Sequence, residues 1–121
     1  MDWGLCDEQP FWMQVDDGKI LTLPYPIELN DQPAIVGRRV SAEEYANMII
    51  DQFDVLMELK EPHPIVFPLS LHSFIVGQPF RQKHLKRALE HICKRRDEIW
   101  ITTPNEISQI YRKLPDGQQL R

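Results

Sequence analysis

The sequence is poor in cysteine and contains no long hydrophobic run. Its 121 residues include only Cys6 and Cys93, too few for the disulfide framework of a small secreted protein. No stretch approaches the roughly 18 apolar residues of a membrane-spanning helix. The N-terminal residues are acidic, unlike the basic and apolar segments of a signal peptide. These absences favour reduced thiols and predict a cytoplasmic protein without a membrane partner.

The chain also has little net charge. Fourteen basic and 18 acidic residues give −4, which provides no general attraction to nucleic acid. The halves differ, because residues 1–60 hold 4 basic and 12 acidic residues whereas residues 61–121 hold 10 and 6. This asymmetry is compatible with two faces that attract each other, and a homo-oligomer is one expected partnership. The seven Lys and Arg residues of segment 81–96 lie opposite an apolar stripe and lack aromatic neighbours, so a solvated helix face is favoured over nucleic-acid binding.

Prolines interrupt residues 1–40, within which "FWMQVDDGKILTLPY" predicts a hairpin. Its strands are expected at 11–15 and 19–23, around the Asp17-Gly18 step. Ser41 and Glu44 form a capping box that begins a helix, predicted to end near Lys60. The apolar residues of this helix recur at helical spacing, at Tyr45, Ile49, Phe53 and Leu56.

The second half alternates apolar runs with helical patterns. "IVFPLSL" (65–71) and "EIWITT" (98–103) predict buried strands, although Pro68 in the first cannot donate to a sheet. A helix is expected after the Gly77-Gln78-Pro79 turn, with a stripe of Leu85, Ala88, Leu89 and Ile92. A third begins after Thr103, which forms a second capping box with Glu106. Its stripe consists of Ile107, Ile110, Tyr111 and Leu114. The order predicts an α/β fold with parallel strands, in one partial domain: hairpin and loops at 1–40, then helix, strand, helix, strand and helix at 41–121.

Candidate chemistry concentrates at His72, because functional groups gather where the strands of β/α folds end. A polar strand terminus without function is the alternative. No G-x-S-x-G elbow surrounds Ser70 or Ser73, so a serine nucleophile is disfavoured. No close Cys/His spacing predicts a zinc site, and Cys93 is expected in the core with His91 on the surface. The loop "LPYPIELND" (23–31) suits either a substrate pocket or a structural connection.

Four segments in order resemble one known family. They are "LPYPIELND", "MIIDQFD", "LSLHSFIVGQPFR" and "IWITTPNEI", and they are similar to the C-terminal part of the polysaccharide deacetylase (NodB-homology) family. The likeness runs from Asp2 to about Tyr111 and tends toward an intracellular, allantoinase-like or peptidoglycan-deacetylase-like branch. It implies a distorted (β/α) barrel that hydrolyses non-peptide C–N bonds, either in N-acetylated sugars or in allantoin-like amides.

The resemblance also implies roles for individual residues. Leu69-Ser70-Leu71-His72 lies where the family has a Leu-x-His motif, which makes His72 the general acid that protonates the leaving nitrogen. Asp2-Trp3 resembles the end of an Asp-Trp motif, so Asp2 is expected to orient that histidine. The expected substrate-binding residues are Trp3, Tyr25, Glu28, Asn30, Asp31 and Arg81.

Two family motifs are missing from these residues. The Asp-Asp-Gly motif of the catalytic base has no counterpart, because Asp16-Asp17 belongs to the hairpin turn, and no metal-binding pair of histidines is present. We therefore expect no cofactor in this chain, although a divalent metal belongs to the full family domain. The expected function is part of a C–N hydrolase, inactive alone, acting on a small amide or amino-sugar substrate. The alternative is a non-catalytic interaction module that associates through open barrel edges.

Overall fold

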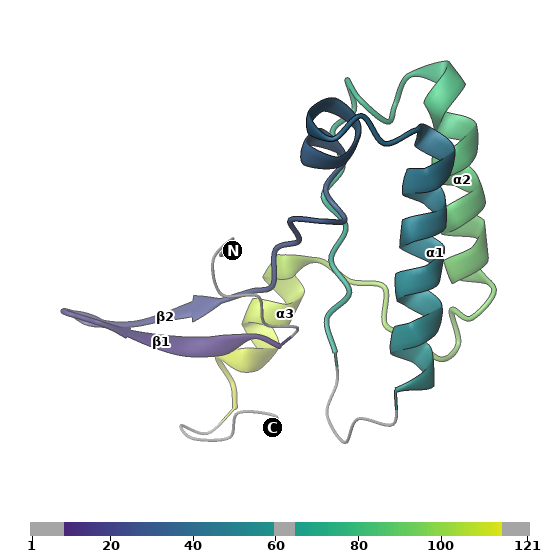
Figure 1. Cartoon of the computed structure of the whole chain (residues 1–121). Helices are drawn as coiled ribbons and strands as arrows, with labels where there is room; N and C mark the ends of the chain where they lie inside the picture. The colour runs from purple at the N-terminus through teal and green to yellow at the C-terminus, as the bar shows by residue number, and fades with distance from the viewer. Residues whose placement is uncertain (1–8, 60–64, 115–121) are drawn as a thin grey trace.

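The computed structural model describes residues 9–59 and 65–114 (Figure 1). A β-hairpin comes first, followed by a short π-helix and three α-helices. Figure 1 shows α1 and α2 side by side, with the hairpin extending away from them. The elements are β1 (Phe11–Val15), β2 (Gly18–Thr22), η1 (Gln32–Gly37), α1 (Ala42–Glu58), α2 (Pro79–Cys93) and α3 (Pro104–Tyr111).

The predicted hairpin is present, but its second strand begins one residue earlier than expected. Val15 pairs with Gly18, so Asp16 and Asp17 form the turn and β2 begins at the glycine. Gly18 adopts a φ of 144°, a conformation that side chains rarely allow. Glycine at position 18 can adopt the backbone conformation with which β2 begins opposite Val15, which explains why the strand includes this residue.

The helix caps follow the sequence prediction. Ser41 accepts a hydrogen bond from the backbone of Glu44, and the Glu44 carboxylate accepts one from the backbone of Ser41. Thr103 and Glu106 repeat this arrangement at the start of α3. Each box satisfies backbone N–H groups that a helix start leaves without partners. α1 ends at Glu58, slightly before the predicted position.

The two predicted strands of the second half do not form. Residues 65–69 and 99–103 carry no strand assignment, and Ser70 makes a single parallel bridge to Asn30. A parallel strand needs a hydrogen-bonded neighbour, and the described residues supply one only at this bridge. Pro68 also lacks the N–H that would extend the pairing. The predicted strand order is therefore wrong for this chain, and the barrel stays a prediction.

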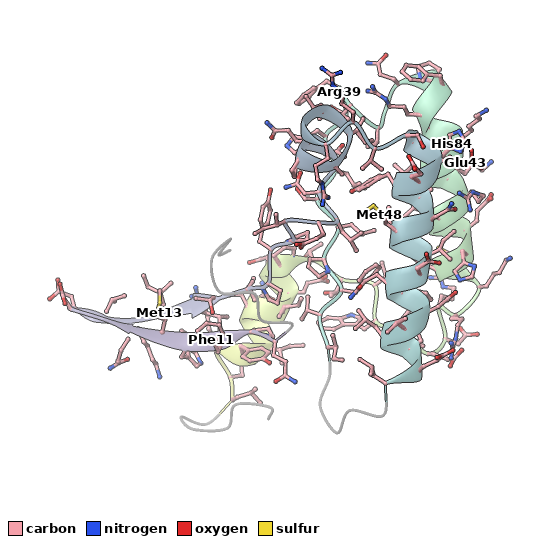
Figure 2. The ribbon with its side chains drawn as sticks, in the orientation of Figure 1. Phe11, Met13, Arg39, Glu43, Met48 and His84 are labelled. Carbon is pink, nitrogen blue, oxygen red and sulfur yellow. The ribbon has the colours of Figure 1, made fainter. Side chains whose placement is uncertain are left out.

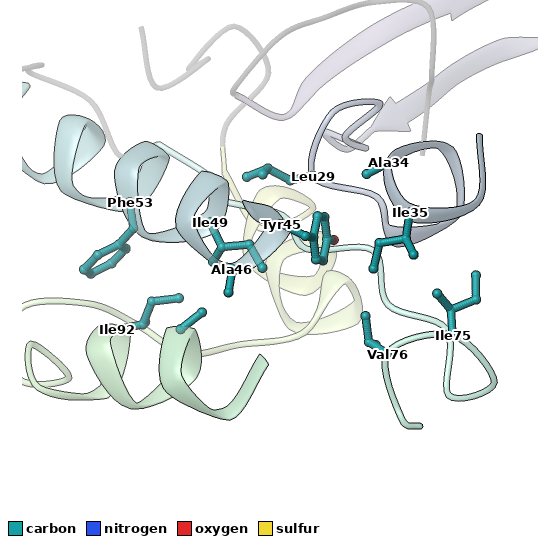
Figure 3. Close-up of a cluster of buried hydrophobic side chains, with 11 residues drawn as sticks. Leu29, Ala34, Ile35, Tyr45, Ala46, Ile49, Phe53, Ile75, Val76 and Ile92 are labelled. Carbon is teal, nitrogen blue, oxygen red and sulfur yellow. The ribbon is translucent and has the colours of Figure 1, made fainter. Parts of the chain in front are cut away.

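The core lies between α1, α2 and the loops beside η1. Tyr45, Ile49 and Phe53 of α1 are buried as their spacing predicted (Figure 3). Ala88 and Ile92 of α2 face them, and Leu29, Ala34, Ile35, Ala46, Ile75 and Val76 complete the buried cluster. Because Ala34 and Ile35 of η1 share this cluster with Ile75 and Val76, the core joins two distant parts of the sequence.

Some burial predictions are wrong. Cys93 is exposed, whereas Ile92 takes the core position beside it. Leu89 and Ile110, expected in buried stripes, are 39% and 44% exposed. Few neighbouring elements cover α2 and α3, so part of each predicted apolar face remains at the surface. None of the helices described here is long and apolar enough to cross a membrane.

Candidate functional site

The parallel bridge brings the loop before η1 against the end of segment 65–71. The backbone N–H of Ser70 donates to the Leu29 carbonyl over 3.1 Å, and the N–H of Asp31 donates to the Ser70 carbonyl over 3.2 Å. This register fixes Asp31 beside His72, 41 residues later in the chain. The single bridge between Asn30 and Ser70 is thus sufficient to bring Asp31 and His72 together.

Asp31 binds His72 through both carboxylate oxygens. Its Oδ1 lies 2.6 Å from His72 Nδ1, and its Oδ2 accepts the His72 backbone N–H over 2.8 Å. The Asp31 side chain is fully buried, whereas that of His72 is 29% exposed. An ionised carboxylate only accepts hydrogen bonds, so Nδ1 carries the hydrogen of this contact. The other ring nitrogen, Nε2, is then the one that can exchange a proton with a substrate.

Tyr25, Asn30 and Ser70 form a polar network beside this pair. The Tyr25 hydroxyl lies 2.9 Å from Ser70 Oγ and accepts a hydrogen bond of 3.3 Å from the Asn30 amide. The Asn30 side-chain oxygen in turn accepts the backbone N–H of Gln32. These bonds connect the bridge to the start of η1, so they help hold the loop that carries Asp31.

The loop after His72 is closed by short-range hydrogen bonds. The His72 carbonyl accepts from the N–H groups of Ile75 and Val76. Phe74 is 68% exposed and lies edge-on to the His72 ring, with the ring centroids 5.4 Å apart. The imidazole therefore has a buried acid at one nitrogen and an exposed aromatic ring at its side.

Tyr45 is a buried residue of α1 in the core. Its side chain is 2% exposed, and its hydroxyl has no hydrogen-bond partner among the described residues. Burial raises the pKa of the Tyr45 phenol above its usual value, and the nearby Asp31 charge raises it further. Both effects disfavour the phenolate, so this side chain stays neutral.

The predicted site residues divide into three groups. Tyr25, Asn30, Asp31 and His72 come together as described. Glu28 is exposed and Arg81 lies on α2, where its guanidinium donates to the Ile75 carbonyl and packs 4.8 Å from the Phe80 ring. Asp2 and Trp3 lie outside the described residues. The structure therefore brings four of the predicted residues together, and their roles stay predictions. The sequence did not show that Asp31, predicted as a substrate ligand, contacts His72.

Arg81 also lines a separate groove of about 450 Å³ at the ends of α1 and α2. Figure 2 shows Arg39, Glu43 and His84 near that end of the two helices. Neither His72 nor its network residues Tyr25, Asn30, Asp31 and Ser70 line this groove. Its size alone therefore does not identify it as the reactive site.

His91 and Arg87 of α2, which the sequence analysis considered for a zinc site and for nucleic-acid binding, make hydrogen bonds to α1. His91 Nε2 lies 2.7 Å from Asp54 Oδ1, which links α2 to α1, and Arg87 donates to Asn47 over 2.7 Å. These two side chains of α2 therefore join the two helices. Among residues 9–59 and 65–114, no group of three Cys, His, Asp or Glu side chains could hold a metal ion. We therefore derive no step through a metal.

Two comparisons bear on this arrangement. A Schizosaccharomyces pombe protein named "Putative polysaccharide deacetylase" is 28% identical over an alignment of 116 residues, which covers 87% of this chain and 36% of that protein. The crystal structure of a "probable Polysaccharide deacetylase" from Pseudomonas aeruginosa matches 90% of this chain with a TM-score of 0.76. Both comparisons confirm the likeness to polysaccharide deacetylases.

The extent of the likeness to polysaccharide deacetylases is limited. The structural match has 24% sequence identity and covers 37% of the Pseudomonas chain, so it establishes the fold. No family model matches the chain. The chain spans about a third of each of these two polysaccharide deacetylases, which fits the predicted C-terminal part. The allantoinase-like branch stays a prediction.

Proposed function

We propose that this chain forms the general-acid part of a polysaccharide-deacetylase-like hydrolase of non-peptide C–N bonds. The observation that carries the proposal is the Asp31–His72 pair, with Nδ1 held 2.6 Å from a fully buried carboxylate. The two relatives named as polysaccharide deacetylases support the same reaction class.

The orientation of His72 suits proton donation to a leaving nitrogen. Asp31 fixes the ring, because it holds both Nδ1 and the backbone N–H of the same residue. When the imidazole is protonated, Nε2 carries a hydrogen and the carboxylate stabilises the positive charge. An amine is a poor leaving group without a proton, so a positioned imidazolium aids collapse of the tetrahedral intermediate. Transfer leaves a neutral imidazole whose Nδ1–H still faces Asp31.

The proposed substrate is an N-acetylated amino sugar, with allantoin-like amides as the second choice. The exposed ring of Phe74 beside His72 offers an apolar surface to the carbon face of a sugar. Tyr25 supplies a hydroxyl beside Ser70, and Arg81 of α2 supplies a guanidinium that reaches the Ile75 carbonyl in the loop after His72. The names of the two relatives favour the sugar over the cyclic amide.

A chimera tests this proposal. The chain would replace the matching 37% of the Pseudomonas protein, and acetate release from N-acetylated chito-oligosaccharides would be measured. We expect activity in the chimera, no activity in the isolated chain, and loss of activity in His72→Ala. The variant His91→Ala is the control, because His91 also contacts an Asp but lies between α1 and α2. Equal activity of His72→Ala and the parent chimera would contradict the proposal. Allantoin, assayed in parallel, tests the second substrate.

An interaction module is the second candidate function. Trp100 and Ile101 are 57% and 61% exposed in the segment predicted as a strand, which leaves apolar side chains beside unpaired backbone. Such an edge favours association. Light scattering during size exclusion decides this point: a dimer of the isolated chain that dissociates in Trp100→Lys supports the module, and a monomer at micromolar concentration contradicts it.

A further inference from the structure

The buried hydroxyl of Tyr45 is an anomaly within the described part of the chain. It is the one buried side-chain polar atom there that lacks a hydrogen-bond partner. Leaving such a donor without an acceptor costs free energy, so native proteins rarely retain one without a reason. Phenylalanine would fill the same space without the hydroxyl.

The position of Tyr45 suggests the reason. Its ring projects from α1 toward η1, close to Ala34 and Ile35 in the same buried cluster (Figure 3). Asp31 is the residue that precedes η1, and it too is fully buried. A neutral phenol and a carboxylate therefore share one region of the core from which water is largely excluded.

The two oxygens of Asp31 are not saturated by His72. Each accepts one hydrogen bond from that residue, and a carboxylate oxygen can accept about two. The Tyr45 ring is directed toward η1, which begins directly after Asp31, and the Asp31 charge also raises the pKa of the Tyr45 phenol. In a low-dielectric interior, an O–H dipole directed at a carboxylate is stabilising even beyond hydrogen-bond distance.

We propose that Tyr45 is a positioning residue of the Asp31–His72 pair: its O–H dipole points at the Asp31 carboxylate and moderates the pull of that carboxylate on the His72 proton. Among the described residues, Asp31 is the charged group that contacts His72, and Arg81 reaches the nearby Ile75 carbonyl from α2. Tyr45 acts through Asp31 and does not touch the substrate. The effect of Tyr45 on the Asp31–His72 pair does not depend on the proposed function. Its relevance to catalysis rests on the proposed role of His72 as general acid.

The test is the NMR titration of the His72 ring in the full 121-residue chain and in Tyr45→Phe. Loss of the dipole leaves the Asp31 charge less compensated, so the midpoint of the His72 titration should rise. Tyr111→Phe is the matched control, because Tyr111 is 7% exposed and lies on α3, and it should leave the midpoint unchanged. An unchanged or lowered midpoint in Tyr45→Phe would overturn the proposal.

Thermal unfolding gives an independent readout. If the hydroxyl had no favourable interaction with Asp31, Tyr45→Phe would unfold at the same or a higher temperature, because only an unsatisfied polar group is removed. The proposal predicts a lower midpoint temperature, and it predicts that the loss disappears in the Asp31→Asn background. A loss of equal size in both backgrounds would show that Tyr45 does not act through Asp31.

The unsubstituted chain decides the question if Tyr45→Phe does not fold. The Tyr45 hydroxyl proton should exchange slowly with solvent, and its chemical shift should move as His72 titrates. A hydroxyl signal that ignores this titration would overturn the proposal. None of these measurements uses activity, so an inactive chimera would refute the proposed function without affecting this result.

Discussion

Replacing Asp31 by Asn isolates the charge of the pair while preserving its shape. The amide oxygen can still accept the His72 backbone N–H, but the amide nitrogen must then face His72 Nδ1. An amide N–H is a donor, so Nδ1 has to become an acceptor and the ring hydrogen moves to Nε2. The substitution should therefore reverse the tautomer of His72.

The geometry sets the expected loss of stability. Two contacts of 2.6 and 2.8 Å join a fully buried carboxylate to His72. A hydrogen bond to a charged group contributes about 1.5–3 kcal/mol, and Asn retains one of the two contacts in weaker form. Removal of a buried charge offsets part of the loss. We expect Asp31→Asn to lower the free energy of unfolding by about 2 kcal/mol.

Urea denaturation measures this loss, and ¹⁵N chemical shifts of the imidazole report its tautomer. Asp54→Asn is the matched control, because His91 and Asp54 make a similar 2.7 Å contact but are 33% and 46% exposed. Exposed pairs contribute little, so the control should lose less than about 1 kcal/mol. Equal losses in both variants, or an unchanged His72 tautomer in Asp31→Asn, would refute the reasoning.

Three further outcomes follow from the packing and the caps. Gly77→Ala should destabilise the fold by about 1–3 kcal/mol in urea denaturation, because its Cβ would lie 2.2 Å from the Ser73 carbonyl oxygen; unchanged stability would contradict this geometry. Phe53→Ala should cost about 3–5 kcal/mol in the same assay, since Phe53 is 3% exposed, and a loss below 1 kcal/mol would mean that its site is not packed. Hydrogen bonds from Ser41 lower the pKa of Glu44 below its usual 4.5, so the ionised Glu44 stabilises the fold above that pH and this stabilisation is lost as the pH falls below it. Glu44→Gln should therefore make Tm depend less on pH on the acid side of a Tm-against-pH curve. A curve as steep as that of the parent chain would refute this.

The local signals in the sequence were reliable where the contacts are local. The capping boxes at Ser41 and Thr103 involve residues three positions apart, and both are present. The buried residues of α1 followed from their spacing in the same way. The predicted strands at 65–71 and 98–103 failed because a strand depends on a neighbour, and only Asn30 pairs with Ser70 among the described residues.

In the site too, the residues could be found from the sequence, but their long-range contact could not. His72 and the loop containing Asp31 were both singled out from the sequence, yet their contact joins residues 41 positions apart. No periodicity encodes such a pairing, so Asp31 was predicted to bind substrate. One usable signal was an acid two residues after the apolar Leu29 and directly before a helix, because a buried acid requires a partner. The π-helix η1 and the role of Tyr45 had no signal in the sequence pattern.

The most direct test of the account is the dependence of the His72→Ala effect on the leaving group, measured in the active chimera. An N-acetylated sugar needs a proton on its leaving nitrogen, whereas p-nitrophenyl acetate releases a stable anion without one. If His72 is the general acid, His72→Ala should lower kcat/KM for the N-acetylated sugar by about 10²–10⁴-fold, while hydrolysis of the ester changes by less than about tenfold. Equal losses on both substrates, or no loss on the sugar, would contradict the assignment of His72.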